Sequence, residues 1–273
     1  MSVVLMLIAS ACFATMAAMI KGIGSSLPIP EIILFRSILP LPFFLGALWL
    51  QKKKLIVTAW KTLLLRAFFG FLAISGFYYA LTHIPLAVSV FLGKTQPLIL
   101  AILAPWIVGE KTSPSVWLAI GTGLIGIVLI LDPSLGWTAA AWASIGAATA
   151  SAIAHLLVRK LNRTDDPVTI VANFFVITAL LSSIWMGPSF IMPDHTEWLL
   201  LGGVALFSTI GQYLMTLAYR MDYAPVVAAA SYTSIIFSIL FGYFFWNEVP
   251  PASAWAGGTL IIAGSLILLR SRI

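Results

Sequence analysis

Apolar residues form long segments along almost the whole chain, and short polar or turn-forming stretches separate them. A helix needs roughly 20 apolar residues to cross a hydrocarbon core about 30 Å thick. The segments have this length, so the pattern predicts an all-α integral membrane protein with ten transmembrane helices. The expected spans are residues 2–22, 30–50, 61–82, 86–107, 114–131, 137–159, 168–187, 197–219, 225–245 and 252–271.

The tryptophan positions give an independent indication of the helix ends. Indole rings favour the headgroup level of a membrane, where one side is apolar and the other is hydrated. All 10 tryptophans lie close to the end of an expected span: Trp49, Trp60, Trp106, Trp117, Trp137, Trp142, Trp185, Trp198, Trp246 and Trp255. This distribution supports the same set of spans.

The composition excludes a soluble globular domain, because only 9% of the residues are charged, against about 25% in soluble domains. The single cysteine, Cys12, lies in the first apolar segment, which excludes an intramolecular disulfide and a cysteine-rich metal site. Residues 2–20 have no basic stretch before them and nine further spans follow. We therefore expect a retained first helix rather than a signal peptide.

The net charge of +6 is compatible with a nucleic-acid partner, but the positions of the basic residues favour another interpretation. With a cytoplasmic N-terminus, eleven of the 15 basic residues fall in inner loops or the C-terminal tail, and only Lys21 falls in an outer loop. Arg36, Arg66 and Lys94 lie within spans. Cytoplasmic loops are enriched in Lys and Arg, so we expect both termini in the cytoplasm, a plasma (inner) membrane location and no nucleic-acid partner.

The chain aligns with itself without gaps when it is shifted by 138 residues. The shift pairs Ala80 with Ala218, Glu110 with Glu248, Trp117 with Trp255, and Gly126 with Gly264. This pattern predicts two five-helix halves, residues 1–134 and 135–273. Because five is odd, the second half enters the membrane inverted, and inverted repeats around a central cavity are typical of alternating-access transporters. A duplication kept for stability alone is the alternative.

The length, the ten spans and the five-plus-five duplication resemble the drug/metabolite transporter superfamily, in particular its ten-helix EamA-type exporters. The residues that carry the resemblance are Arg36, Gly109-Glu110, Asn247-Glu248 and the glycines of the fifth and tenth spans (Gly121, Gly123, Gly126, Gly257, Gly258 and Gly264). One departure is Phe174, which stands where the second half would repeat Arg36. Within the superfamily the chain is similar to the YddG-type exporters of aromatic amino acids and methionine, which implies such substrates and outward transport.

Lys94 is the strongest candidate for substrate binding. An ionisable group at the bilayer centre costs about 2.5–3.5 kcal/mol, so such residues usually face a cavity. Lys94 lies about 13 Å along the fourth span, hence near the midplane. Pro97 follows it and loosens the helix by removing one backbone hydrogen bond. We expect Lys94 to attract a substrate carboxylate; the alternative is a structural lysine that caps a freed carbonyl or reaches the membrane surface.

Other polar and aromatic residues inside the spans are further candidates. Substrate contacts are expected from Tyr78, Tyr79, Gln96, His155, Gln212 and Tyr232. Each has a structural alternative, namely packing or hydrogen bonding between helices. Tyr232 occupies the repeat position of Lys94, so the two are expected to face each other across a twofold axis. Structural or gating roles are expected for Arg36, Pro97, Glu110 and Glu248, with Arg36 bonding backbone carbonyls near Pro40 and Pro42.

Acidic residues are absent from the middle third of every span, because Glu31, Glu110 and Glu248 fall at helix ends. Proton-coupled pumps and antiporters of cationic drugs usually keep a membrane carboxylate. Its absence favours an anionic or zwitterionic solute moved without tight ion coupling. Residues 121–126 match the dinucleotide fingerprint but lack its strand and exposed helix start, and no P-loop or HExxH motif occurs. We therefore expect no cofactor and no metal.

These observations predict a secondary transporter, not an enzyme, that exports small amphipathic metabolites by alternating access, above all aromatic amino acids and methionine. A permease for another organic anion or a nucleotide-sugar-like metabolite is the alternative, and it predicts more basic residues in the cavity than Lys94 and Arg36. For an intramembrane enzyme, Ser151 with His155 is the only candidate pair, and a scaffold would leave Lys94 without a purpose. The expected partners are the small-molecule substrate and the lipid bilayer. We expect a monomer, although the glycine-rich helices can pack within one chain or between two.

Overall fold

The computed structural model describes residues 1–53, 55, 57–109, 115–130 and 138–270, and no strand occurs among them. The helices are α1 (Ser2–Ile23), α2 (Ile29–Ile38), α3 (Leu41–Leu50), α4 (Trp60–His83), α5 (Leu86–Gly93), α6 (Gln96–Ile107), α7 (Ser115–Ile130), α8 (Ala139–Leu161), α9 (Pro167–Met186), α10 (His195–Met221), α11 (Ala224–Ala230), α12 (Thr233–Trp246) and α13 (Ala252–Arg270). Each expected span coincides with one helix or two consecutive helices, and the ends agree within two residues. The predicted all-α architecture is therefore confirmed.

Three of the spans are built from two helices with a short break between them. Proline explains two of the breaks because it has no backbone N–H to donate: Pro40 precedes α3, and Pro97 lies in the first turn of α6. The break between α11 and α12, at Ser231 and Tyr232, contains no proline. There the hydroxyl of Ser234 donates a hydrogen bond of 2.9 Å to the backbone oxygen of Ser231, and such side-chain bonds compete with helical ones.

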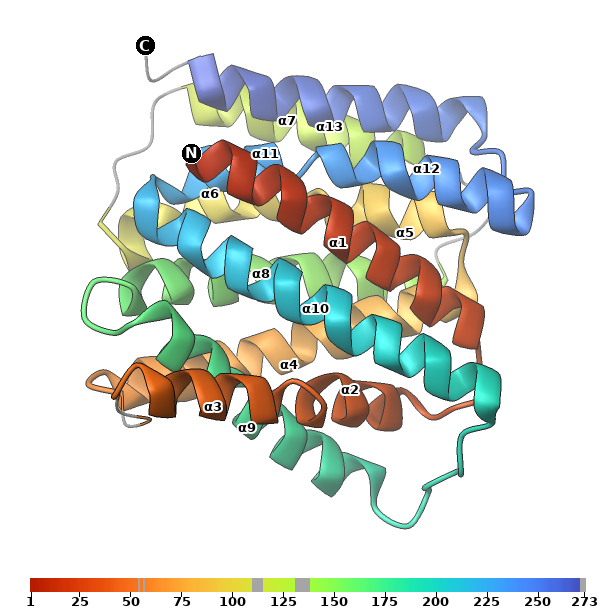
Figure 1. Cartoon of the computed structure of the whole chain (residues 1–273). Helices are drawn as coiled ribbons and strands as arrows, with labels where there is room; N and C mark the ends of the chain where they lie inside the picture. Colours follow the sequence, from red (N-terminus) through yellow and green to blue (C-terminus); the bar gives the residue numbers. More distant parts are fainter. Residues whose placement is uncertain (54, 56, 110–114, 131–137, 271–273) are drawn as a thin grey trace.

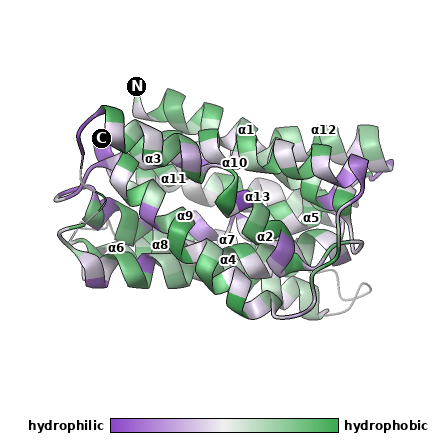
Figure 2. Cartoon of the chain, turned by 60° about the horizontal axis from the view of Figure 1, so that its bottom comes forward, coloured by the Kyte–Doolittle hydropathy of each residue, from purple (hydrophilic) through white to green (hydrophobic). Residues whose placement is uncertain are grey.

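The outer surface of the bundle is suited to lipid. Within the described residues, 8 helices or helix pairs are long and apolar enough to cross a membrane, and α7 and α13 lie on the two remaining expected spans. Phe43, Ile184 and Phe244 are largely exposed on this surface. Figure 2 shows mostly hydrophobic helices, with hydrophilic residues gathered in the loops at their ends. An exposed apolar surface of this extent indicates membrane contact.

Two of the three broken spans, α5–α6 and α11–α12, lie together on one side of the bundle, and the third, α2–α3, lies at the opposite face. Figure 1 shows α7 and α13 along one face and α2, α3 and α9 at the opposite face. α5, α6 and α11 contact α7 or α13, and α12 packs on α5, while α4 packs along α8 and α1 packs along α10. The glycine-rich helices α7 and α13 therefore pack against each other within one chain.

The close packing of α4 on α8 depends on Gly76. A Cβ atom at this position would lie 2.9 Å from the backbone oxygen of Ala143 and 3.2 Å from Cβ of Ala147. Because a backbone atom cannot move aside unless α8 shifts, we expect Gly76→Ala to lower the free energy of unfolding by about 1–3 kcal/mol. Thermal unfolding in detergent measures the effect. Gly146→Ala on α8 is the control, since a Cβ there meets nothing within 4 Å; equal midpoints for both variants would contradict the expectation.

Candidate substrate-binding site

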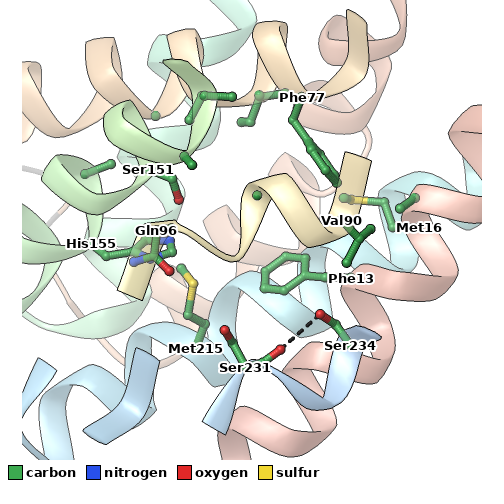
Figure 3. Close-up of a pocket in the computed structure, with 18 of the residues that line it drawn as sticks. Phe13, Met16, Phe77, Val90, Gln96, Ser151, His155, Met215, Ser231 and Ser234 are labelled. Atoms are coloured by element: carbon green, nitrogen blue, oxygen red, sulfur yellow. Dashed lines mark hydrogen bonds between the residues drawn. The ribbon is translucent and has the colours of Figure 1, made fainter. Parts of the chain in front are cut away.

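A cavity of about 210 Å³ lies in the middle of the bundle. Its apolar lining includes Phe13 and Met16 of α1 and Phe77 of α4, which Figure 3 shows around the same space. Its polar lining includes Gln96 of α6 and His155 of α8. Mostly apolar walls with a few convergent polar groups are typical of sites for small molecules.

Lys94 lies at the break between α5 and α6, where this break meets the one between α11 and α12. Its Nζ donates a hydrogen bond of 3.1 Å to Oγ of Ser231, and Oη of Tyr232 donates one of 3.0 Å to the backbone oxygen of Lys94. The structure thus brings Lys94 and Tyr232 together, although Tyr232 contacts the backbone of Lys94 and is not a lining residue. Because an ammonium has three N–H groups, the bond to Ser231 leaves donors for an anion.

A second polar group joins α6, α8 and α10. Nδ1 of His155 lies 3.2 Å from Nε2 of Gln96 and 3.2 Å from Oη of Tyr219. Tyr219 is fully buried and was not among the residues expected from the sequence. Gln212 also lines the cavity, with its Nε2 3.5 Å from the hydroxyl oxygen of Thr216. Of these side chains, Gln96, His155 and Gln212 line the cavity and offer it polar donors and acceptors.

Two arginines line another part of the cavity, Arg36 of α2 and Arg66 of α4, and each is 2% exposed. The guanidinium carbon of Arg66 lies 3.6 Å from the ring centre of Phe174, and that of Arg36 lies 6.0 Å from the same ring. Gly70 makes room for this stack, because a Cβ atom there would collide with Nη1 of Arg66 and lie 2.8 Å from the Phe174 ring. Arg66 is a site residue that the sequence did not single out.

Within the part of the chain that the structure describes, Arg36, Arg66 and Lys94 have no acidic partner. Nε and Nη1 of Arg36 and of Arg66 lack a hydrogen-bond partner, and no Asp or Glu occurs among the described residues that line the cavity. Nε and Nη1 of Arg36 therefore make none of the expected bonds to backbone carbonyls near Pro40. A buried cation without a counter-ion is costly, so the arrangement favours a negatively charged occupant.

The remaining expected residues lie in varied places. Tyr78 is buried and lines the cavity. Tyr79 is not a lining residue, and its ring packs against that of His83 with centroids 4.1 Å apart. Pro97 is buried in the first turn of α6. Glu110 lies outside the described residues.

Glu248 connects three helices at one end of the bundle. Its Oε1 lies 2.5 Å from Nζ of Lys21 in the last turn of α1, and its Oε2 accepts a hydrogen bond of 2.9 Å from the backbone N–H of Leu86 at the start of α5. Under the 138-residue shift, Arg159 takes the place of Lys21. Arg159 Nη1 donates a hydrogen bond of 2.9 Å to the backbone oxygen of Tyr219 at the opposite end. Lys21 and Arg159, which occupy corresponding positions in the two halves, therefore join helix ends at the two opposite ends of the bundle.

Comparison with known proteins identifies the family. The EamA-like transporter family model matches residues 1–132 and 138–270. The pseudopaline exporter CntI of Pseudomonas aeruginosa is 29% identical over 273 residues, which cover 99% of this chain and 96% of the relative. A riboflavin transporter of Brucella anthropi is 30% identical over 199 residues, 70% of each chain. A crystal structure with 18% identity matches the fold with a TM-score of 0.75, over 99% of this chain and 97% of that one. The chain therefore belongs to the EamA-like transporter family, and it is a membrane transporter of a small molecule rather than an enzyme.

Proposed function

We propose that this chain is a secondary transporter that carries a small organic anion through its central cavity. The observation behind this proposal is the charge of the cavity, which Arg36, Arg66 and Lys94 line without any acidic residue among the described lining. The organic-anion alternative predicted from the sequence requires more basic residues than Lys94 and Arg36, and Arg66 supplies one.

Export of aromatic amino acids and methionine is the second candidate, and the apolar lining by Phe13, Met16 and Phe77 favours it. An amino acid at neutral pH also carries an ammonium group. In this cavity the ammonium would lie near three cations, and the described lining offers it only uncharged acceptors, such as the side-chain oxygen of Gln212. Like charges in a partly desolvated site repel strongly, so we rank the organic anion first.

We propose that the cavity opens alternately to the two sides through movement of two inverted halves, residues 1–134 and 135–273. The helix pairing supports this division. Under the 138-residue shift, the pair α4–α8 corresponds to the pair α10–α1. In the same way, the pair α5–α12 corresponds to the pair α11–α6. The two helices of each of these four pairs are in contact. α7 packs against its own counterpart, α13. Such twofold pairing is expected for inverted repeats that share a midplane site.

The proposed setting is the plasma (inner) membrane with both termini in the cytoplasm, and the distribution of Lys and Arg supports it. Outward transport is supported by the name of the pseudopaline exporter among the relatives. Transport without tight ion coupling is supported by the lack of acidic residues in the described lining of the cavity, since a coupled carrier usually keeps a membrane carboxylate.

Uptake into proteoliposomes tests the proposal with two matched pairs of solutes. Phenyllactate differs from phenylalanine, and 2-hydroxyglutarate from glutamate, only in a hydroxyl group that replaces the ammonium. We expect at least one hydroxy acid to be taken up at least about tenfold faster than its amino acid, because the cavity charges repel the ammonium. Methionine is measured beside them, with and without a pH gradient, which should leave the rates unchanged.

The variant Lys94→Gln should lower uptake of the favoured acid at least about tenfold, since it removes a charged hydrogen-bond donor. Lys160→Gln is the matched control, because Lys160 is exposed at the end of α8 and does not line the cavity. Faster uptake of phenylalanine and methionine than of the hydroxy acids would instead support amino acid export.

A further inference from the structure

We infer that the transported anion carries two acidic groups, one held by Arg36 and Arg66 and the other by Lys94. Arg36, Arg66 and Phe174 form the arginine subsite, and Lys94 with Ser231 forms the lysine subsite. This inference rests on the proposed function and narrows its substrate class.

In the arginine subsite, two guanidinium groups lie beside an aromatic ring instead of a carboxylate. The ring of Phe174 stabilises the charge of Arg66 from its face, with the guanidinium carbon 3.6 Å from the ring centre. This contact with the ring face leaves the N–H groups in the guanidinium plane free to donate hydrogen bonds. Nε and Nη1 of both arginines have no hydrogen-bond partner. A guanidinium presents these groups in the geometry that carboxylate or phosphate oxygens accept. The subsite therefore fits one acidic group.

The lysine subsite lies on the other side of the cavity. Arg36, Arg66 and Phe174 come from α2, α4 and α9, whereas the lysine subsite comes from the breaks in the α5–α6 and α11–α12 pairs. Figure 1 shows α2 and α9 on the face of the bundle away from these broken helices, and α2 and α9 pack on each other and on α4 and α10. Both subsites line one cavity, so a single solute that neutralises both must extend across it.

Most of the cavity lining outside the two subsites is apolar. Phe13, Met16 and Phe77 contribute to it, and Figure 3 shows Phe13 near the middle of the space. An apolar wall offers no partner to further charges and favours hydrocarbon contact. The substrate class is therefore a dianion with its acidic groups at the two ends of a less polar middle part.

The duplication explains why the subsites lie opposite each other. The 138-residue shift pairs Arg36 with Phe174 and Lys94 with Tyr232. The members of each pair meet: the Arg36 guanidinium carbon is 6.0 Å from the Phe174 ring centre, and Tyr232 bonds the backbone oxygen of Lys94. Residues that meet their own repeat partner lie on the twofold axis. The first half has the basic residues Arg36 and Lys94 at these two positions, and the second half has the aromatic residues Phe174 and Tyr232. Because both subsites lie on the twofold axis, a dianion bound at both lies along this axis.

Calorimetric titration of the purified protein in detergent tests the inference with a series of linear dicarboxylates: glutarate, adipate, pimelate and suberate. Each diacid is compared with its monomethyl ester, which lacks one charge at nearly the same size. In the wild-type chain we expect one diacid to bind at least about tenfold tighter than its half-ester, because the second acid gains charge-assisted hydrogen bonds. Affinity should peak at one chain length, since the subsites have a fixed separation.

Two variants assign the effect to the subsites. The ratio of half-ester to diacid dissociation constants should fall to about one in Lys94→Gln, which removes the lysine subsite, and should fall well below the wild-type ratio in Arg66→Gln, which leaves only Arg36 in the arginine subsite. Lys160→Gln should keep the wild-type ratio. Arg66→Lys is a second variant that retains the charge without the planar fork, and it should give an intermediate ratio.

The outcomes separate this inference from the proposed function. Equal affinity for diacids and half-esters in the wild type, or equal loss of both in Arg66→Gln, would overturn the two-subsite inference and leave organic-anion transport standing. Binding of amino acids with no binding of any carboxylate in the series would overturn both.

Discussion

The variant Arg66→Met should be more stable than the wild type in the absence of ligand and yet lose anion transport. The guanidinium of Arg66 is 2% exposed, and its Nε and Nη1 have no partner. Replacing buried charges with apolar side chains of similar volume often stabilises proteins by about 1–4 kcal/mol. Loss of the contact with Phe174 offsets part of this gain, roughly up to 2 kcal/mol for a desolvated cation on a ring. We therefore expect a higher thermal unfolding midpoint together with at least about tenfold slower uptake of the transported acid.

Scanning fluorimetry in detergent and uptake into proteoliposomes measure the two effects on the same preparation. Arg163→Met is the control, because Arg163 Nη2 donates a hydrogen bond of 2.8 Å to the backbone oxygen of Val108. That variant should be no more stable than the wild type. A midpoint of Arg66→Met below the wild-type value would mean that Arg66 supports the fold and would refute its assignment to the substrate.

The variant Glu248→Gln should open the end of the bundle where Lys21 lies, the outer end in the proposed orientation. The carboxylate of Glu248 accepts from Nζ of Lys21 and from the backbone N–H of Leu86. The amide that replaces the carboxylate has only one oxygen, so it cannot replace both oxygens that accept from Lys21 and from Leu86. It also has no charge to attract Lys21. Hydrogen bonds to charged groups contribute about 1.5–3 kcal/mol, enough to shift the population of open molecules at least about tenfold.

A cysteine in the cavity reports this opening. Ser234 lines the cavity and is buried, so a cysteine placed there by Ser234→Cys, in a Cys12→Ser background, is protected while the cavity is closed. When Glu248→Gln is added, this cysteine should react with a membrane-impermeant maleimide from that side at least about tenfold faster than without it. Glu197→Gln is the matched control. Glu197 lies near the start of α10, where its side chain and backbone bond Asp194 in the capping box. Unchanged labelling in Glu248→Gln would show that this ion pair does not keep the cavity closed.

The spans were predictable because each is defined by a local run of apolar residues. A helix of this kind can cross the lipid without contacts to other parts of the chain. The break at Lys94 follows from Pro97, a residue that the sequence makes visible. The break before α12 has no proline and depends on hydroxyls such as that of Ser234. Serine and threonine occur in many helices without breaking them, so this break could not be placed from the sequence.

The site was less predictable than the fold because it depends on which side of each helix faces the middle. Neighbouring residues differ by about 100° around a helix, so Tyr78 can line the cavity while Tyr79 packs on His83. In a segment that is apolar all round, no amphipathic stripe reveals the inner side. The role of Arg66 depends on Phe174 and Gly70, and the contact with Phe174 joins distant parts of the chain.

The unneutralised cations of the cavity have an electrical consequence. A solute that balances them carries negative charge, and each elementary charge that crosses a membrane gains or loses about 2.3 kcal/mol per 100 mV. A dianion leaving a cell with a negative interior therefore gains about 4.6 kcal/mol per 100 mV, and the same voltage opposes its entry. For the proposed dianion held by Arg36, Arg66 and Lys94, the resting voltage of the cell therefore favours outward transport without a coupled ion.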